Sequence, residues 1–184
     1  PTIKNGNDQA HTIGLGGMGL HTMFATNQMH YGSPESIEFT DIYFMLLNYY
    51  TLAASNKIAK ERGEAFVNFN KSSYYTGEYF DAYTDSDVVF QSEKVKHIVE
   101  GIKVPTKEDW LQLKQAVRES GLYHQNRLAI APTGSISYVN ETSASLHPIT
   151  RLIEERQEKK TGKTYYPAPQ LSNETMPYYR SAYD

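Results

Sequence analysis

The sequence has 184 residues, of which 39% are hydrophobic and 21% charged, and its formal net charge at pH 7 is −3. These values are ordinary for a globular domain, and the acidic balance gives no basic footprint for binding nucleic acid. The chain contains no cysteine, which excludes disulfides, cysteine-ligated metal and any thiol chemistry carried by these residues themselves.

Membrane insertion is not expected. Residues 42–56 form the longest charge-free stretch within a predicted helix and include several polar side chains, whereas a span needs about 20 mainly apolar residues. The N-terminal stretch PTIKNGNDQA has no apolar signal core. We therefore expect no membrane partner and a cytoplasmic location.

The first third of the chain predicts two helices. Residues 1–11 are polar and are expected to be irregular, and apolar residues over 12–29 suggest a helix weakened by glycines. A long buried helix should follow, because Ser33 is a natural N-cap, Pro34 suits the first turn and Gly63 can end the helix.

The middle of the chain predicts short helical pieces and one longer helix. Residues 64–90 are rich in tyrosine and phenylalanine and suggest short helical turns, and SEKVKHIVEGI suggests a short helix. Thr106 and Asp109 have the spacing of a capping box at the start of a stronger helix, which Gly121 can stop.

The last third predicts few strands. NRLAIAP (126–132) is expected to be a strand, followed by a loop of small residues. Residues 149–169 suggest extended segments around a Lys-Thr-Gly turn, and a helix capped by Ser172 or Asn173 should begin near the end. The fold class predicted is therefore α/β, mostly helical.

The stretch TIGLGGMGL holds a G-x-G-x-x-G spacing at Gly14, Gly16 and Gly19. A dinucleotide-binding fingerprint needs an apolar strand before it and an acid at a strand end about 20 residues on. The preceding KNGNDQAHT is too polar for a buried strand, and Glu38 falls inside the long predicted helix. We reject the fingerprint and expect these glycines to let two helices approach closely.

The segment APTGSIS (131–137) is a better candidate site, because it follows the predicted strand and leads toward a helix. Thr133, Ser135 and Ser137 supply hydroxyls, and Gly134 frees the backbone to turn N–H groups toward an anion. The loop has no lysine or arginine, so dipoles and hydrogen bonds would hold a phosphate. An ordinary strand-exit turn is the alternative reading.

The histidines and tyrosines carry no site of their own. The six histidines show no metal-ligand spacing, so no metal site is predicted. Tyrosine occurs 15 times, often in pairs, and packing against a larger body is a more ordinary role for these rings than a radical relay.

Several separated segments resemble the large subunit of ribonucleotide reductases in order and spacing. They are IGLGGMGLHTMFA, YGSPESIEFTDIYF, ASNKIAKERG, GLYHQNRLAIAPTGSISYVNETSASLHPI and TYYPAPQLSNE. The forms PTGSIS…HPI and YYPAP are most similar to class Ib. The resemblance implies a mostly helical segment of a ten-stranded α/β barrel, with residues 1–184 as a single partial domain. It also implies that a loop of five residues holds the diphosphate of a ribonucleoside diphosphate substrate: Pro132, Thr133, Gly134, Ser135 and Ile136.

The family's reaction needs groups that these residues lack. It uses a thiyl radical on a cysteine, a reducing cysteine pair, and an Asn and a Glu beside the radical, all expected in a preceding portion. The partners implied are the rest of the large subunit, a small subunit with a metal-tyrosyl radical and a redoxin-type reductant. Tyr165 and Tyr166 match a different segment from the family's relay tyrosines. We therefore expect about a quarter of a large subunit, inactive alone and without catalytic residues.

Two further readings stay open. The chain could be a non-catalytic scaffold or interaction fragment derived from the same fold, since it predicts few strands and many tyrosines. A free-standing dehydrogenase built on Gly14 to Gly19 is disfavoured, because neither flanking strand is predicted.

Overall fold

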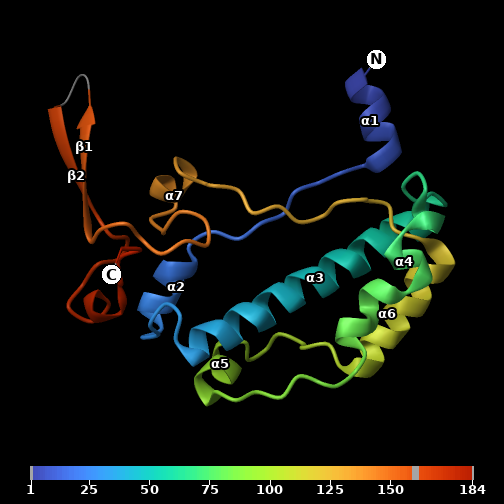
Figure 1. Ribbon diagram of the computed structural model, residues 1–184, viewed down its shortest axis with the longest axis horizontal. Helices are drawn as coiled ribbons and strands as arrows, with labels where there is room; N and C mark the ends of the chain where they lie inside the picture. The colour runs from blue at the N-terminus through green and yellow to red at the C-terminus, as the bar shows by residue number, and fades with distance from the viewer. Residues whose placement is uncertain (1, 159–161, 184) are drawn as a thin grey trace. The chain divides into compact units, whose positions relative to one another are not determined.

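A computed structural model describes residues 2–158 and 162–183. The chain divides into two compact units, named here unit 1 (residues 1–15 and 38–129) and unit 2 (residues 16–37 and 130–184). The regular structure of the described residues is mainly helical, with one two-stranded sheet (Figure 1), which agrees with the predicted predominance of helix over strand. No helix within these residues has both the length and the apolar character that crossing a bilayer requires.

The polar N-terminus is helical, so the prediction of an irregular start was wrong. Helix α1 (Thr2–Ala10) buries none of its residues and therefore carries no apolar pattern that would reveal it. Its end is held by backbone hydrogen bonds instead. The carbonyl of Gln9 accepts from the N–H of Val67 at 2.9 Å, and the carbonyl of Ala10 accepts from the N–H of Gln125 at 2.9 Å.

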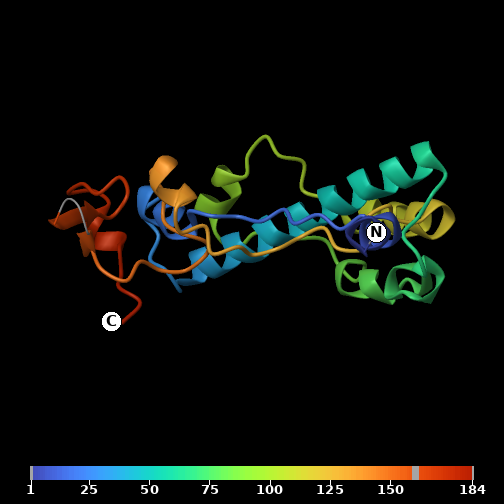
Figure 2. The ribbon, with the colours of Figure 1, turned by 90° about the horizontal axis from the view of Figure 1, so that it is seen from above.

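Two extended segments of unit 1, residues 11–15 and 125–129, run side by side (Figures 1 and 2). The N–H of Leu15 donates to the carbonyl of Arg127 at 2.8 Å, and the N–H of Ala129 donates to that of Leu15 at 2.9 Å. Leu15 and Leu128 make an isolated parallel bridge. The predicted strand 126–132 is therefore wrong as a strand, because one bridge is not a ladder.

The helix predicted over 12–29 forms only near its end, as α2 (Leu20–Thr26). Backbone pairing with residues 125–129 keeps the first part extended. A Cβ on Gly14 would lie 3.0 Å from the Cβ of Ala129, so this pairing needs a residue without a side chain there. Gly14 therefore serves the pairing of two extended segments rather than the packing of two helices.

The long helix α3 (Pro34–Arg62) begins and ends where the sequence predicts. The Ser33 hydroxyl accepts from the N–H of Ser36 at 3.3 Å, as an N-cap side chain does. Gly63, which follows the last helical residue, has a φ of 64°, the left-handed conformation that glycine adopts most readily.

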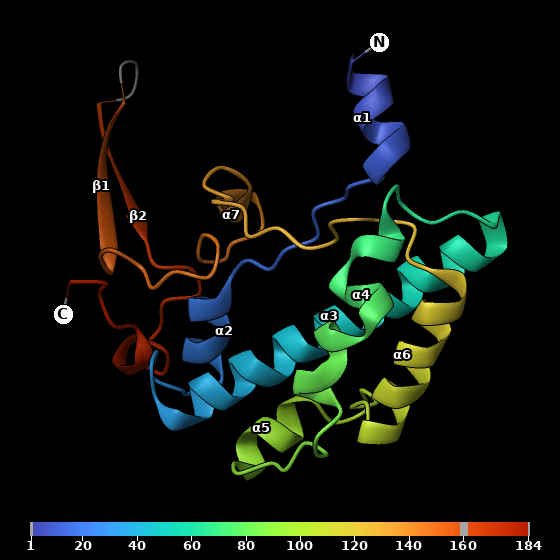
Figure 3. The same ribbon diagram turned by 45° about the vertical axis from the view of Figure 1, so that its right-hand side comes forward.

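Several helices and helical turns follow α3 in unit 1 (Figure 3). They are the 3₁₀ turns η1 (Phe69–Lys71) and η2 (Glu78–Tyr83) and the helices α4 (Ser73–Thr76), α5 (Glu93–Ile98) and α6 (Lys107–Ser120). The core is built from seven buried side chains: Leu52, Phe66, Phe80, Trp110, Leu113, Val117 and Leu122. The short helical turns predicted over 64–90 are confirmed, as is the short helix that follows them.

The capping box that starts α6 is present as predicted. The Thr106 hydroxyl accepts from the N–H of Asp109, and the Asp109 carboxylate accepts from the N–H of Thr106 at 2.9 Å. Hydrogen bonds from Lys103 and Thr106 lower the pKa of Asp109 to about 2. The capping carboxylate therefore stays charged at every pH above that value.

Unit 2 contains α2, α7 (Ile136–Val139), η3 (Met176–Tyr178) and an antiparallel hairpin of β1 (Ile153–Glu158) and β2 (Gly162–Pro167). The predicted extended pair is confirmed, whereas residues 159–161, most of its predicted turn, lie outside the described residues. The predicted C-terminal helix is only the 3₁₀ turn η3. Tyr179 follows this turn with extended backbone, and its hydroxyl lies between the Thr22 hydroxyl (3.1 Å) and the Pro169 carbonyl (2.5 Å).

Candidate functional site

The candidate loop lies in unit 2 and turns sharply at Thr133. This residue has a φ of 49°, whereas Gly134 has no left-handed φ. The sequence predicted that Gly134 would provide the unusual backbone conformation of the loop, whereas in the structure Thr133 adopts it. Left-handed backbone costs a non-glycine residue about 1–2 kcal/mol. Glu141 and Ser145, with φ values of 48° and 50°, add further strain to the same stretch of chain.

Hydrogen bonds anchor the loop from within unit 2. The Thr133 hydroxyl accepts from the N–H of Ser145 at 2.7 Å, and the Ser137 hydroxyl donates to the Gly134 carbonyl at 3.0 Å. Ser137 is buried, and its carbonyl accepts from the N–H of Thr142 at 3.0 Å. Two of the three predicted hydroxyls therefore hold the loop in shape. The third, that of Ser135, is exposed and has no partner among the described residues.

The loop presents three consecutive unpaired backbone donors. Within the described part of the chain, the N–H groups of Gly134, Ser135 and Ile136 have no hydrogen-bond acceptor. All three residues and Pro132 are exposed. A Cβ on Gly134 would meet no atom within 4 Å, so the space in front of this residue is open. Consecutive N–H groups of this kind form an anion-binding concavity.

Gly19 supports the loop at its far end. Its N–H donates to the carbonyl of Ser145 at 3.0 Å, and its φ is 81°. A Cβ at this position would overlap the Oγ1 of Thr142 and would lie 3.2 Å from its Cβ. Only glycine meets both requirements. The last glycine of the rejected fingerprint thus packs against the chain that follows α7.

A pocket of about 710 Å³ in unit 2 adjoins the loop. Ser137 and Tyr138 of α7 form part of its wall, together with His147, Arg151 and Glu154. The five predicted residues themselves do not line this pocket. Arg151 is exposed and has no hydrogen bond or ion pair among the described residues. It places a positive charge in the wall of this pocket.

Sequence reasoning did not single out Arg151. The signal available was its position, since it is the first lysine or arginine after the loop. The position of Arg151 in the pocket wall depends on the conformation of residues 141–149, which follow α7. No local sequence pattern predicts that conformation.

The hairpin contacts α7 through one polar and aromatic cluster. The Tyr138 hydroxyl donates to Oε2 of Glu154 at 3.2 Å, and Arg156 pairs with the same oxygen at 3.1 Å. The Arg156 guanidinium lies 4.6 Å from the centre of the Tyr138 ring. Burial, and then the charge of Glu154, raise the pKa of Tyr138. Its hydroxyl therefore stays protonated and remains a donor.

His21 is fully buried and connects α2 with two other segments of unit 2. Its Nδ1 accepts from the N–H of Ile149 at 2.9 Å, so the ring hydrogen of the neutral form is on Nε2 and is donated to the Tyr178 carbonyl. The N–H of Arg180 also lies 3.4 Å from Nε2, a distance too long for a competing bond. Burial lowers the pKa of His21 below 6.5.

We expect unit 2 to lose stability in mild acid because of His21. The unfolded chain binds the proton at a higher pH than the folded chain, so the stabilisation is fully present above pH 6.5 and declines as the pH falls toward the lowered folded pKa. Protonation of Nδ1 also removes its bond from Ile149. Urea unfolding of the 184-residue chain between pH 7.5 and 5 measures the decline.

The matched comparison is His21→Gln against His97→Gln, since His97 is exposed. Burial also lowers the pKa of His124 in unit 1, so His124 contributes to the pH dependence of stability in both variants. The effect of His21 is therefore measured as the difference in pH dependence between the two variants. His21→Gln should flatten the pH dependence more than His97→Gln does. Equal slopes for wild type and His21→Gln would contradict this expectation.

Comparison with known proteins indicates the class of fold, an α/β barrel domain. The family model for the ribonucleotide reductase barrel domain matches residues 1–184, so the chain belongs to this family. The family membership predicted from the sequence is confirmed. Among the described residues, no group of histidine, aspartate and glutamate side chains is arranged to hold a metal ion.

Similar proteins come from several bacteria. The ribonucleoside-diphosphate reductase subunit alpha of Bacillus subtilis is 46% identical over 184 residues, which cover 100% of this chain and 26% of the relative. The subunit of the same name from Mycoplasma pneumoniae is 40% identical over 98% of this chain and 26% of its own length. That from Helicobacter pylori is 31% identical over 99% and 22%. The chain thus spans about a quarter of the length of the curated relatives it matches.

Proposed function

We propose that this chain is a segment of the large subunit of a ribonucleoside-diphosphate reductase, and that Pro132, Thr133, Gly134, Ser135 and Ile136 hold the substrate's diphosphate. The observation that carries this proposal is the set of three consecutive N–H groups, at residues 134–136, that have no acceptor among the described residues. Such donors bind anionic oxygens without any proton transfer.

The surroundings of the loop favour the same reading. Thr133 and Ser137 fix the loop before any ligand arrives, so little conformational entropy is lost on binding. Arg151 in the neighbouring pocket wall adds the positive charge that a diphosphate requires. Binding the diphosphate away from the reacting carbon would orient the ribose toward a radical carried by another part of the subunit.

The rest of the machinery belongs to other parts of the assembly. The chain has no cysteine, so the radical cysteine and the reducing cysteines would come from the remainder of the large subunit. We include in the proposal a ten-stranded barrel of the class Ib type, a small subunit with a metal-tyrosyl radical and a redoxin-type reductant. The segment alone would bind substrate but reduce none.

Calorimetric titration of the 184-residue chain with CDP or ADP tests the loop. Ser135→Ala should weaken binding several-fold without changing stability, because its hydroxyl has no partner among the described residues. Thr133→Ala should lower stability as well, because the N–H of Ser145 then loses its acceptor. If a full-length subunit carrying this segment binds CDP equally well with and without the Ser135 hydroxyl, the assignment of Ser135 fails.

If that full-length subunit binds no nucleoside diphosphate at all, the scaffold reading is favoured instead. In that case the segment would serve to pack against its companion polypeptide, and its loop would have no ligand.

A further inference from the structure

Unit 1 contains a buried arginine that has no acidic partner among the described residues. Arg127 is 4% exposed. Its guanidinium donates to Oδ1 of Asn48 at 3.0 Å and to the Tyr74 hydroxyl at 3.2 Å, and both acceptors are neutral. The ion pairs in the described part of the chain all involve other residues. The positive charge is therefore buried without a counter-charge.

Asn48, Tyr74, Tyr79 and Arg127, named here the Arg127 cluster, have more donors than acceptors. Oδ1 of Asn48 already accepts from both Arg127 and the Tyr79 hydroxyl, the latter at 2.8 Å. Nε of Arg127 and Nδ2 of Asn48 are buried and have no partner among the described residues. Both unpaired atoms are donors, so the missing group is an acceptor.

The tyrosines do not supply the missing negative charge. Burial raises the pKa of Tyr79, so its hydroxyl stays neutral and acts as a donor. The ring of Tyr74 lies 5.3 Å from the guanidinium and offers only a cation–π contact, which is much weaker than an ion pair with a buried arginine.

A carboxylate fits the cluster better than any neutral acceptor. It carries the charge that Arg127 lacks, and its two oxygens can accept from a guanidinium and an amide N–H at the same time. A buried charge left without such a partner costs several kcal/mol. The chain has 21 acidic residues, yet among those described none pairs with Arg127.

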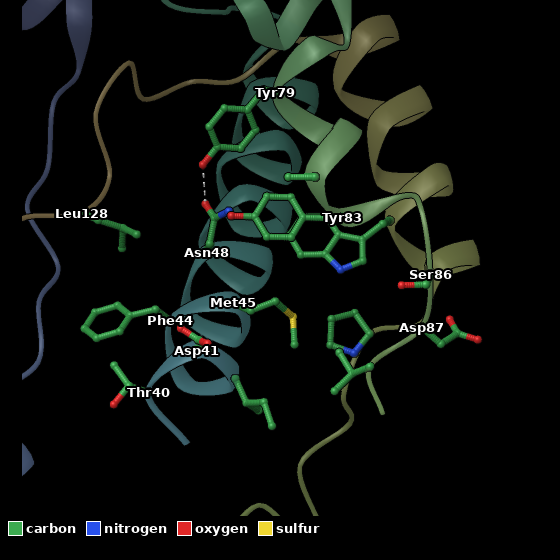
Figure 4. A pocket seen from close by; sticks show the side chains of 15 residues that line it. Thr40, Asp41, Phe44, Met45, Asn48, Tyr79, Tyr83, Ser86, Asp87 and Leu128 are labelled. Carbon is green, nitrogen blue, oxygen red and sulfur yellow. Dashed lines mark hydrogen bonds between the residues drawn. The ribbon is translucent and has the colours of Figure 1, made fainter. Parts of the chain in front are cut away.

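A pocket of about 670 Å³ in unit 1 is lined by two members of the cluster, Asn48 and Tyr79, while Arg127 lies behind them outside the lining. Figure 4 shows Asn48 in its wall, bonded to Tyr79, with the rings of Tyr83 and Phe44 nearby. Leu128, which follows Arg127 in the chain, forms another part of the wall. The volume is sufficient for a whole side chain to enter.

The charge of the pocket indicates where the carboxylate comes from. Asp41 and Asp87 also line the pocket, and both are exposed. Two carboxylates in the wall repel a freely diffusing anion. A side chain fixed by its own polypeptide overcomes that repulsion, because folding has already brought it to the site.

We propose that the Arg127 cluster receives the carboxylate of an aspartate or glutamate from the part of the large subunit outside this chain. This inference rests on the proposed function, because it requires the chain to be a segment of that longer subunit. The bond would join unit 1 to the rest of the subunit, whereas the diphosphate loop belongs to unit 2.

Formate, the smallest carboxylate, is the probe for the 184-residue chain. Thermal unfolding is compared in concentrated sodium formate and in sodium chloride at the same high ionic strength, at which salt screens the repulsion by Asp41 and Asp87. The wild-type Tm should be higher in formate. The difference should vanish in Arg127→Met, which removes the charge and keeps a similar volume, and should persist in Arg118→Met, which removes an exposed arginine. Equal wild-type Tm values in the two salts overturn the proposal without any variant.

The full-length subunit that carries this segment tests the source of the carboxylate. There the formate effect should be absent, because a side chain already occupies the cluster. Arg127→Met should then raise the unfolding equilibrium constant by about 100-fold or more, since it leaves a buried carboxylate unpaired. A formate effect that persists in the full-length subunit overturns the side-chain source.

CDP binding by the same full-length samples separates this inference from the proposed function. If the subunit binds CDP while Arg127→Met raises its Tm, the inference about the cluster fails and the diphosphate loop stands. If CDP binding is absent but Arg127→Met lowers the Tm, the loop assignment fails and the cluster stands.

Discussion

Gly134→Val should abolish nucleoside diphosphate binding and leave the unfolding free energy nearly unchanged. The backbone of Gly134 is not left-handed and no atom lies within 4 Å of its Cβ position, so a side chain there enters open space, in which we propose that the diphosphate binds. A branched side chain would cover the three unpaired N–H groups. Losing even one charge-assisted hydrogen bond weakens binding by roughly tenfold or more.

Gly134→Ala is the matched control for the size of the side chain. Like valine, alanine removes the extra backbone freedom of glycine, but it adds only a single methyl group. Gly134→Ala should therefore weaken CDP binding less than Gly134→Val does. Calorimetric titration gives the affinity, and urea unfolding gives the stability. If Gly134→Val lowered both the unfolding free energy and the affinity for CDP, the space around the Cβ position of residue 134 would not be open as the structure shows.

Gly19→Ala should destabilise unit 2 by about 3 kcal/mol. Two causes add: a left-handed φ of 81° at a residue with a side chain, and the overlap of its Cβ with the side chain of Thr142. Because Thr142 also bonds to Ser137, the displacement should reach the diphosphate loop. Urea unfolding should therefore show a lower midpoint, and CDP titration weaker binding.

Gly32→Ala separates the two causes. Gly32 belongs to the same unit and has a φ of 83°, but a Cβ there would meet no atom within 4 Å. It should cost only the backbone strain, about 1 kcal/mol. Combining Gly19→Ala with Thr142→Ala should recover part of the lost stability. Equal losses for Gly19→Ala and Gly32→Ala would show that the contact with Thr142 is unimportant.

The helices whose signals are local could be predicted from the sequence. Ser33 and Gly63 mark the ends of α3, and Thr106 with Asp109 marks the start of α6, because a capping side chain acts within one helical turn. The same reasoning failed for residues 12–29. There, hydrogen bonds to a segment more than 100 residues away keep the chain extended, and no window of local sequence contains both partners.

The composition of the candidate loop was enough to single it out, but the structural roles of its residues could be predicted only in part. Small polar residues at 133–137 indicated an anion site, while the structure gives the left-handed turn to Thr133 and uses Ser137 as an anchor. Gly19 contacts Thr142, and Arg151 shares a pocket wall with Ser137, only in the folded unit. These contributions could not be predicted from the loop's own sequence.

Unit 2 is built from two separate stretches of the chain, residues 16–37 and 130–184, so its first stretch is synthesised before the second. Helix α2 leaves the ribosome well before its partners, because Thr22 bonds to Ser143, 121 residues later, and to Tyr179, 157 residues later. His21 likewise waits for Ile149, 128 residues further on. The helix therefore emerges before its partners exist. A premature stop shortly before Tyr179 would consequently disturb a helix made near the beginning of the segment.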